Sequence, residues 1–556
     1  MRKSRAAAVF ATITGLLAVT AAAALMLSSK APPEGLPRFD DPLPDEDLAN
    51  ALVAAMTDSE LLAQTLMFGW AGTDPSPLVT DWVAERGLGS IKIFGWNTDD
   101  TRKVAESVTA LQKKAAEGRF GIPLFVATDQ EGGWIRHIKG RTTETPGNLA
   151  IGASGLPADA WNTGYYISRE LGALGINLNF APAVDLYTDH ESTVIGPRSF
   201  GEDPDAAGIL GAAFVAGSRA AGVLTTAKHF PGHGDTGMDS HGKLPVIPID
   251  GKTFRSRELV PFRYLIDAGV EAVMSGHLNF PQITGNDEPA TFSKLLLNDV
   301  LRDEMGFTGL IVTDDIMMNG ATEYAGSVSR AVQLALEAGN DIIESSTTPS
   351  FGDAFWAKNL DRMSRVPAFR DRVKDAARRV ILAKLSYFKD DDAVPVYPDL
   401  AKLEERVPDP EGKEFFLSQA VRSVTLVRNA GLPLGEPGRV LLASAFPSFL
   451  EAGTARFPGA ETSGVNWNLP KRARAFDTVI FCLSSREQLP VLNALRGEKC
   501  RVIVVSALSP VLLENAPWVN TALAVYSYAP LSFTAAFGAL AGDFTPEGIM
   551  PLKGIN

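Results

Sequence analysis

The chain has 556 residues, enough for about three to five domains of ordinary size, or for two if one of them is a large barrel. Hydrophobic residues make up 45% and charged residues 21%, a balance that excludes an intrinsically disordered chain and a protein with many membrane spans. The net charge of −13 argues against a nucleic-acid partner, and the two cysteines, Cys482 and Cys500, are too few for a disulfide framework or a cysteine-based zinc site.

The first thirty residues have the pattern of an export signal. Arg2, Lys3 and Arg5 precede an uncharged run over residues 6–27, which is long enough to cross a bilayer. A stretch rich in proline follows at 32–37, so a helix of the protein core is not expected here. An uncleaved membrane anchor is slightly favoured over a cleaved signal peptide, because the apolar run is long and no clear cleavage site follows it. In both cases we expect the rest of the chain outside the cytoplasmic membrane, at its periplasmic or extracellular face.

Residues 31–390 alternate short apolar runs with helical patterns. Eight runs have the length and composition of buried strands: 64–70, 90–94, 123–129, 177–185, 223–230, 271–277, 309–315 and 341–344. Helical patterns lie between most of them, at 101–116, 205–220, 256–268 and 328–338. Repetition of strand and helix is typical of parallel strands buried under helices, and eight such units predict a catalytic (β/α)8 barrel of the TIM type. A doubly wound open sheet is the alternative.

Six of the predicted strands end in charged or titratable residues. These are Asp129, Asp185, Lys228 with His229, His277, Asp314 with Asp315, and Glu344. A single polar strand end is weak evidence, but packing does not explain six of them. Since catalytic groups of α/β barrels lie at the carboxyl ends of the strands, the pattern predicts an active site at this end of the barrel.

A second domain follows the barrel. Residues 391–412 contain several prolines and acidic residues and predict a linker. Over 413–556, helical stretches alternate with five further apolar runs: 424–427, 439–445, 476–483, 501–508 and 521–528. We therefore expect a smaller C-terminal α/β domain.

The segment 228–241 holds the densest group of unusual residues. It reads K-H-F-P-G-H-G-D-T-G-M-D-S-H, begins at a predicted strand end and continues as a glycine-rich loop able to fold over a cleft. A structural loop is the plainest interpretation. Acid–base catalysis is another, in which Asp239 orients the imidazole of His241 and raises its pKa.

A metal site is the third interpretation of this segment. Its ligands would be His229, His233, Asp239 and His241. Pro231 and the glycines exclude the helix that a His-x-x-x-His pair would need, and no glutamate follows His229 as in metalloproteases. We therefore expect neither a metal nor any other cofactor.

The same segment resembles the signature of glycoside hydrolase family 3, in its bacterial β-N-acetylglucosaminidase branch. That branch has K-H-F-P-G-H-G, then four residues, then D-S-H, and every fixed position matches here. Further segments resemble family motifs: I-K-I-F at 91–94 with Asn97, D-Q-E-G-G at 129–133, N-F-A-P at 179–182 with Asp185, R-S-F-G at 198–201 and V-T-D-D at 312–315. More loosely, 423–429 and 548–552 resemble the family's C-terminal domain.

The resemblance implies roles for individual residues. Asp314 matches the nucleophile that forms a covalent glycosyl–enzyme, His241 the general acid/base, and Asp239 its partner. Residues that hold the sugar hydroxyls match Asp129, Arg198, Lys228 and His229. The family often has an arginine shortly after D-Q-E-G-G, where this chain has Trp134 and His137, so one sugar contact is expected to differ.

Elementary physical chemistry adds three expectations. Asp314 must stay ionised, and nearby Lys228 is a candidate for lowering its pKa. Asp315 is expected to be structural, because alternation along a strand turns it to the opposite face. The aromatic rings of Trp96 and Trp134 are candidates for stacking on sugar rings or for plain packing.

The resemblance implies a retaining exo-β-N-acetylglucosaminidase that acts on oligosaccharides derived from cell-wall peptidoglycan or chitin. Cleavage needs a carboxylate on one face of the sugar and a proton donor on the other, and an imidazolium suits the second task. The alternatives are a phosphorylase on the same scaffold, since a histidine does not repel phosphate, a β-glucosidase, and a non-catalytic sugar-binding protein. An oligosaccharide is the expected partner, and the sequence leaves the oligomeric state open.

Overall fold

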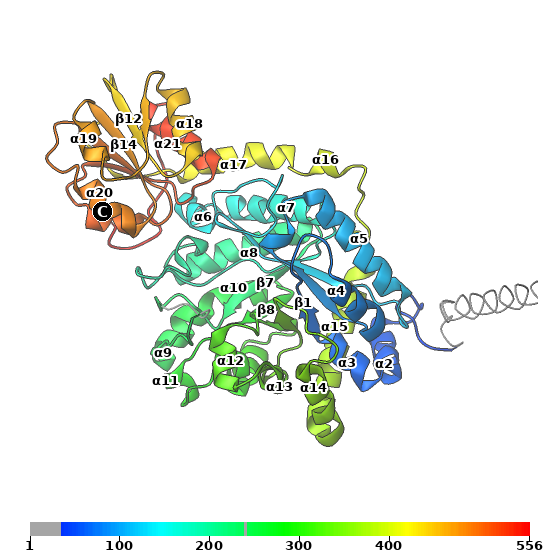
Figure 1. Ribbon diagram of the computed structural model, residues 1–556. Helices are drawn as coiled ribbons and strands as arrows, with labels where there is room; N and C mark the ends of the chain where they lie inside the picture. Colours follow the sequence, from blue (N-terminus) through cyan, green and yellow to red (C-terminus); the bar gives the residue numbers. More distant parts are fainter. Residues whose placement is uncertain (1–34, 238–241, 556) are drawn as a thin grey trace, which may run out of the picture.

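The computed structural model describes residues 35–237 and 242–555 (Figure 1). The expected export segment at 6–27 lies outside the described residues, as do Asp239 and His241. No helix in the described part of the chain combines the length and the apolar character needed to cross a membrane.

The first and larger unit is a barrel of parallel strands. Its strands are β1 (Leu66–Phe68), β2 (Ser90–Ile93), β3 (Phe125–Thr128), β6 (Leu178–Asn179), β7 (Leu224–Phe230), β8 (Ala272–Ser275), β9 (Leu310–Thr313) and β10 (Ile343–Ser345). They pair in the order β10-β1-β2-β3-β6-β7-β8-β9, always in parallel. A parallel bridge between Val312 and Ile342 joins the two ends of this sheet. The predicted (β/α)8 barrel is therefore confirmed, and the open-sheet alternative is wrong.

Each predicted strand run overlaps one of these strands, which is usually shorter than the run, and β10 extends one residue beyond the run 341–344. The run 177–185 is shortened most, because the chain turns away after Asn179 and Pro182 has no amide to donate to a neighbouring strand. Its later residues still lie against β7, where Val184 N donates to the carbonyl of Lys228 at 2.9 Å.

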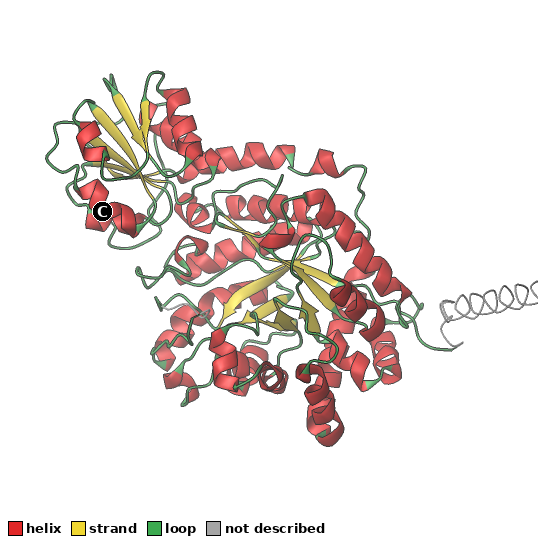
Figure 2. Cartoon of the chain, viewed as in Figure 1, coloured by secondary structure: helices red, strands yellow, loops and turns green. Residues whose placement is uncertain are grey.

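Helices cover the outside of the barrel (Figure 2). They are α2 (Asp45–Ala55), α3 (Asp58–Gln64), α4 (Pro77–Asp81), α5 (Thr101–Glu117), α6 (Asn148–Ser154), α7 (Pro157–Ala173), α8 (Pro204–Ala220), α9 (Gly251–Thr253), α10 (Leu259–Asp267), α11 (Pro281–Thr284), α12 (Asn319–Ala325), α13 (Val328–Ala338), α14 (Ala354–Arg365) and α15 (Pro367–Phe388). Helix α5 shows why they form: Asp100 caps its first turn, and Val104, Val108 and Leu111 recur on one buried face.

The second unit, at the upper left of Figure 1, has a mixed sheet. Its strands are β11 (Thr425–Arg428), β12 (Val440–Ala443), β13 (Glu461–Ser463), β14 (Thr478–Leu483), β15 (Arg501–Ser506) and β16 (Thr521–Ala524), in the order β11-β16-β15-β14-β12-β13. Only β11 runs antiparallel to its neighbour. Sequence analysis predicts all of these except β13, whose two exposed polar residues give no apolar signal.

Helices flank this sheet and connect it to the barrel. They are α16 (Leu403–Arg406), α17 (Pro410–Ser423), α18 (Pro447–Arg456), α19 (Leu469–Ala473), α20 (Leu489–Asn493) and α21 (Pro530–Ala541). Helix α17 lies along α6 and α7 of the barrel, where Arg422 and Asp159 form an ion pair at 2.5 Å. The expected α/β character of the C-terminal domain is confirmed.

The two units share a small apolar core. Leu149 and Tyr187 of the barrel pack with Val511, Tyr526 and Leu552 of the second unit. The Tyr187 hydroxyl lies 2.8 Å from Ser509 Oγ. The second unit therefore rests against the loops that follow β3 and β6.

Candidate active site

The six polar strand ends converge at the carboxyl end of the barrel. Asp129 directly follows β3, Lys228 and His229 lie near the end of β7, and Asp314 directly follows β9. Parallel strands in register bring their carboxyl ends to one rim, so residues far apart in the sequence become neighbours. This rim is the candidate active site.

Asp129 is held by lysines from two strands. Lys228 Nζ donates to Asp129 Oδ1 at 2.6 Å, and Lys92 Nζ of β2 lies 3.0 Å from Asp129 Oδ2. Burial would raise the pKa of Asp129, but Lys228, Lys92 and His137 together hold that pKa well below its usual range. Asp129 is thus an ionised, fixed acceptor of the kind that binds a sugar hydroxyl.

Glu131 joins Arg198 to the same group. The Arg198 guanidinium donates to both carboxylate oxygens of Glu131, at 2.8 and 2.9 Å, and Lys228 Nζ lies 2.6 Å from Glu131 Oε1. Burial opposes ionisation of Glu131, but Arg198 and Lys228 outweigh burial and lower its pKa. A carboxylate held in this way is a poor proton donor, so Glu131 orients Arg198 and Lys228 instead.

His229 completes the chain of polar contacts. Its Nδ1 lies 2.7 Å from Asp185 Oδ2, and its Nε2 lies 3.3 Å from Arg198 Nη2. Asp185 also accepts the backbone amides of His229 and His233, which fixes the start of the glycine-rich segment. The four residues expected to hold sugar hydroxyls are therefore all in one network.

Asp314 has the environment of an ionised nucleophile. Burial alone would raise its pKa, but His229, His277 and Lys92 lower that pKa to about 2. The expected agent, Lys228, instead pairs with Asp129 and Glu131.

Asp315 has a backbone role, in agreement with expectation. Its Oδ1 accepts the amides of Met317 and Ser346 at 3.0 and 3.1 Å. These bonds tie the loop after β9 to the loop after β10. Asp315 also acts electrostatically on Lys92 and Glu344, so both acids of the pair lie near the charged groups of the rim.

The glycine-rich segment is well anchored up to Gly237. A Cβ at Gly234 would collide with the carbonyl oxygen of Leu186, so only glycine fits there. Asp235 accepts Arg257 Nη2 at 2.6 Å, which fastens the segment to the helical region before α10. Asp239 and His241 come next in the sequence, outside the described residues.

Within residues 35–237 and 242–555, no three His, Cys, Asp or Glu side chains lie close enough together to hold a metal ion. His229, one of the four ligands in the metal hypothesis, is committed to Asp185 and Arg198.

The two tryptophans lie in different environments. Trp96 is 53% exposed and stacks on Phe94, with ring centroids 4.5 Å apart, while its indole nitrogen donates to the carbonyl of Trp70 at 2.8 Å. Trp134 is half-buried. Trp96 therefore presents a fixed, exposed aromatic ring beside Phe94, and stacking on a sugar remains a prediction for it.

Sequence analysis missed the part played by Lys92. This lysine lies inside an otherwise apolar strand, between Ile91 and Ile93. A charged residue in the middle of a buried strand is a recognisable signal. Which carboxylate it contacts could not be inferred from spacing.

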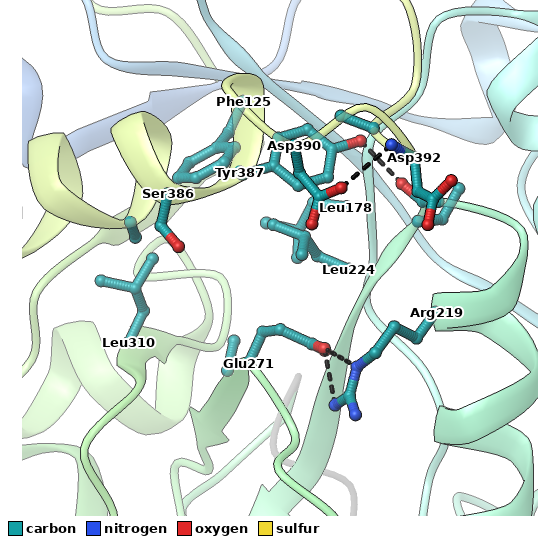
Figure 3. Close-up of a pocket in the computed structure, with 15 residues that line it drawn as sticks. Phe125, Leu178, Arg219, Leu224, Glu271, Leu310, Ser386, Tyr387, Asp390 and Asp392 are labelled. Carbon is teal, nitrogen blue, oxygen red and sulfur yellow. Dashed lines mark hydrogen bonds and ion pairs between the residues drawn. The ribbon is translucent and has the colours of Figure 1, made fainter. Parts of the chain in front are cut away.

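A separate cavity of about 390 Å³ lies at the opposite end of the barrel (Figure 3). Phe125, Leu178, Leu224 and Leu310, the first residues of their strands, form much of its wall. The pair of Glu271 with Arg219 shown in Figure 3 is satisfied at 2.8 Å. This end of a barrel is the stabilising one, so we do not assign the cavity a catalytic part.

Comparison with known proteins agrees with this geometry. The family model described as "Glycosyl hydrolase family 3 N terminal domain" matches residues 59–382, more than half of the chain. The chain belongs to glycosyl hydrolase family 3. It is therefore a glycoside hydrolase, and the resemblance seen in its motifs is confirmed.

Individual relatives of this glycoside hydrolase extend the similarity to the second unit. The chain is 29% identical over 432 residues to β-hexosaminidase A of Pseudoalteromonas piscicida, covering 71% of each chain. A solved family 3 β-N-acetylglucosaminidase from Paenibacillus sp. is 30% identical, with a TM-score of 0.81 over 90% of this chain and 99% of that one. A fungal multi-domain family 3 β-N-acetylglucosaminidase is 29% identical with a TM-score of 0.84. The match covers 90% of this chain and 61% of the fungal chain.

Proposed function

We propose that this glycoside hydrolase is a retaining exo-β-N-acetylglucosaminidase that releases terminal β-linked N-acetylglucosamine from oligosaccharides derived from peptidoglycan or chitin. The observation that carries the proposal is Asp314, an ionised carboxylate beside a network of buried hydroxyl-binding groups. The names of the relatives in Pseudoalteromonas and Paenibacillus support the choice of sugar.

The proposed reaction has two steps. Asp314 attacks the anomeric carbon of the terminal sugar, the bond to the leaving oxygen breaks, and His241 gives that oxygen a proton. Water then gives a proton back to His241 and attacks the same carbon, which releases the sugar and restores the Asp314 carboxylate. Asp239 orients His241 and favours its protonated form.

Substrate specificity provides the first test. Lys228, His229 and Arg198 form a buried polar network at the rim, and a site built to hydrogen-bond a substrate group strongly rejects an analogue that lacks that group. We expect p-nitrophenyl N-acetylglucosaminide to be cleaved roughly 10⁴-fold more efficiently than p-nitrophenyl glucoside. Equal kcat/KM values for the two would make the enzyme a β-glucosidase-like hydrolase with the same fold.

The same assay separates hydrolysis from the alternatives. In phosphate-free buffer and in phosphate the product should be free N-acetylglucosamine, and a sugar 1-phosphate would identify a phosphorylase. A phosphorylase is the second candidate because the residue expected as acid/base is a histidine. A histidine is neutral or cationic and therefore does not repel phosphate, as a carboxylate would. Activity should persist in a strong chelator, and a loss that zinc restores would favour the metal hypothesis. Binding without turnover would identify a sugar-binding protein.

We also propose that the enzyme is exported, on the basis of the basic flank and apolar run at residues 2–27. Fractionation of expressing cells should place it outside the cytoplasm or in the membrane fraction. Recovery as a soluble cytoplasmic protein would contradict export. Sequencing of the mature N-terminus separates the two modes, because a start between Ser28 and Pro32 would mean cleavage and not anchoring.

A further inference from the structure

Lys92 is a buried cation in the floor of the candidate active site. It lies in β2, and its side chain is 5% exposed. Its Nζ is 3.0 Å from Asp129 Oδ2 and 3.4 Å from Glu344 Oε2. The ring centroids of Phe94 and Phe180 lie 4.5 and 5.1 Å from the same ammonium, a distance at which aromatic faces attract cations.

The two oxygens of Asp129 have different partners. Lys228 donates to Oδ1 at 2.6 Å. Oδ2 has Lys92 at 3.0 Å and His137 Nδ1 at 3.5 Å. Burial lowers the pKa of His137, so its ring carries little charge near neutral pH. Lys92 is therefore the full positive charge next to Oδ2.

Glu344 holds Lys92 in this position. It lies in β10, its side chain is fully buried, and its carboxylate makes no hydrogen bond to another described residue. Among the described residues, Lys92 is the one cationic side chain that lies within ion-pair distance of this carboxyl group. The lysine thus lies between the carboxyl groups of Asp129, directly after β3, and of Glu344 in β10, which fixes the direction of its ammonium. Burial raises the pKa of the Glu344 carboxyl group well above its usual range.

We propose that Lys92 is a specificity-determining residue that positions Asp129 for one particular hydroxyl of the terminal sugar. Lys92 does so by fixing the position of Asp129 Oδ2. It supplies the positive charge that an arginine often supplies in the family, at the position where this chain has His137. This inference rests on the proposed function. The competing explanation is a purely structural lysine, which only compensates the buried carboxyl groups of Asp129 and Glu344.

Deoxygenated substrates distinguish the two explanations. The kcat/KM of nitrophenyl N-acetylglucosaminides that lack the 3-, 4- or 6-hydroxyl is compared with that of the parent substrate, and the loss at each position is the deoxygenation penalty. These penalties are measured first for the wild type and D129N. The position whose penalty disappears in D129N identifies the hydroxyl that Asp129 binds. K92M should lower kcat/KM on the parent substrate about 10- to 100-fold, the cost expected for a hydrogen bond to a charged group. It should also shrink the penalty at that same hydroxyl and leave the other two penalties unchanged.

Lys384 offers a matched control. It is also fully buried, but it lies at the other end of the barrel, where its Nζ donates to the carbonyl of Gly89 at 2.6 Å. K384M should lower the melting temperature and leave kcat, KM and all three deoxy penalties as in the wild type. If K92M does not fold, K92R serves in its place, and a changed penalty at the same hydroxyl is expected there too.

A charge-relocation variant completes the test. K92M/H137R returns a permanent cation to the neighbourhood of Asp129 Oδ2, because His137 Nδ1 lies 3.5 Å from that oxygen. It should recover part of the lost kcat/KM together with the penalty at the hydroxyl that Asp129 binds. Wild-type kcat/KM in K92M, or an equal loss on all four substrates that H137R does not restore, would overturn the proposal. Calorimetric titration with N-acetylglucosamine and its deoxy analogues gives the same readout if wild-type turnover is absent, so failure of the proposed function and failure of this inference are distinguishable.

Discussion

Asp314→Asn should lose activity on good and poor leaving groups alike, by more than the roughly 10²–10⁴-fold that general acid catalysis contributes. Asparagine keeps the shape of the side chain but cannot form the glycosyl ester. Because the pKa of Asp314 is lowered to about 2, the carboxylate stays ionised far below neutral pH, and the acid limb of the wild-type pH profile should report another group. Initial rates with p-nitrophenyl and 2,4-dinitrophenyl N-acetylglucosaminides measure both effects.

Asp315→Asn is the matched control for this prediction. Asp315 bonds the amides of Met317 and Ser346, so its replacement should lower the melting temperature and cost far less activity than Asp314→Asn. A D314N enzyme that retains activity, beside an inactive but folded D315N enzyme, would mean that the nucleophile is the second acid of the pair.

His241→Ala should separate substrates by their leaving group. A dinitrophenolate departs almost without protonation, whereas a sugar alkoxide needs a proton in the transition state. The loss should therefore be about 10²–10⁴-fold on a natural disaccharide and much smaller on the dinitrophenyl glycoside, where the glycosyl–enzyme should accumulate. Rapid-quench mass spectrometry of the variant detects that intermediate directly.

Asp239→Asn provides the graded comparison, since it removes only the group that orients and charges the imidazole. It should show the same dependence on leaving group in a milder form. An equal loss on all leaving groups without a trapped intermediate would exclude His241 as the acid/base. Glu131 would be a weak replacement, because Arg198 and Lys228 lower its pKa. Glu344 would also be a weak replacement, because its side chain is fully buried against Lys92.

The periodicity of the chain predicts parallel strands under helices and favours the barrel. Apolar runs such as 309–315, separated by amphipathic helices such as α13 and repeated eight times, suit a closed barrel, and the bridge between Val312 and Ile342 excludes the open sheet. The rim residues follow from the same reasoning, because each lies where a predicted strand ends. The short strand β13 escaped prediction since it is a polar edge with little to bury.

The sequence by itself determined which residues reach the rim, because strand direction and alternation are local properties. Only the tertiary structure decided which of them pair. Asp129 meets Lys92 and Lys228 through the side-by-side packing of β2, β3, β6 and β7, over separations along the chain that no spacing rule covers. The sequence likewise suggested Lys228 as the group that lowers the pKa of Asp314. In the folded chain Lys228 pairs with Asp129 and Glu131, and His229, His277 and Lys92 lower the pKa of Asp314. Electrostatic pairing in a buried site depends on distances of a few ångströms, and those distances exist only once the strands have packed side by side.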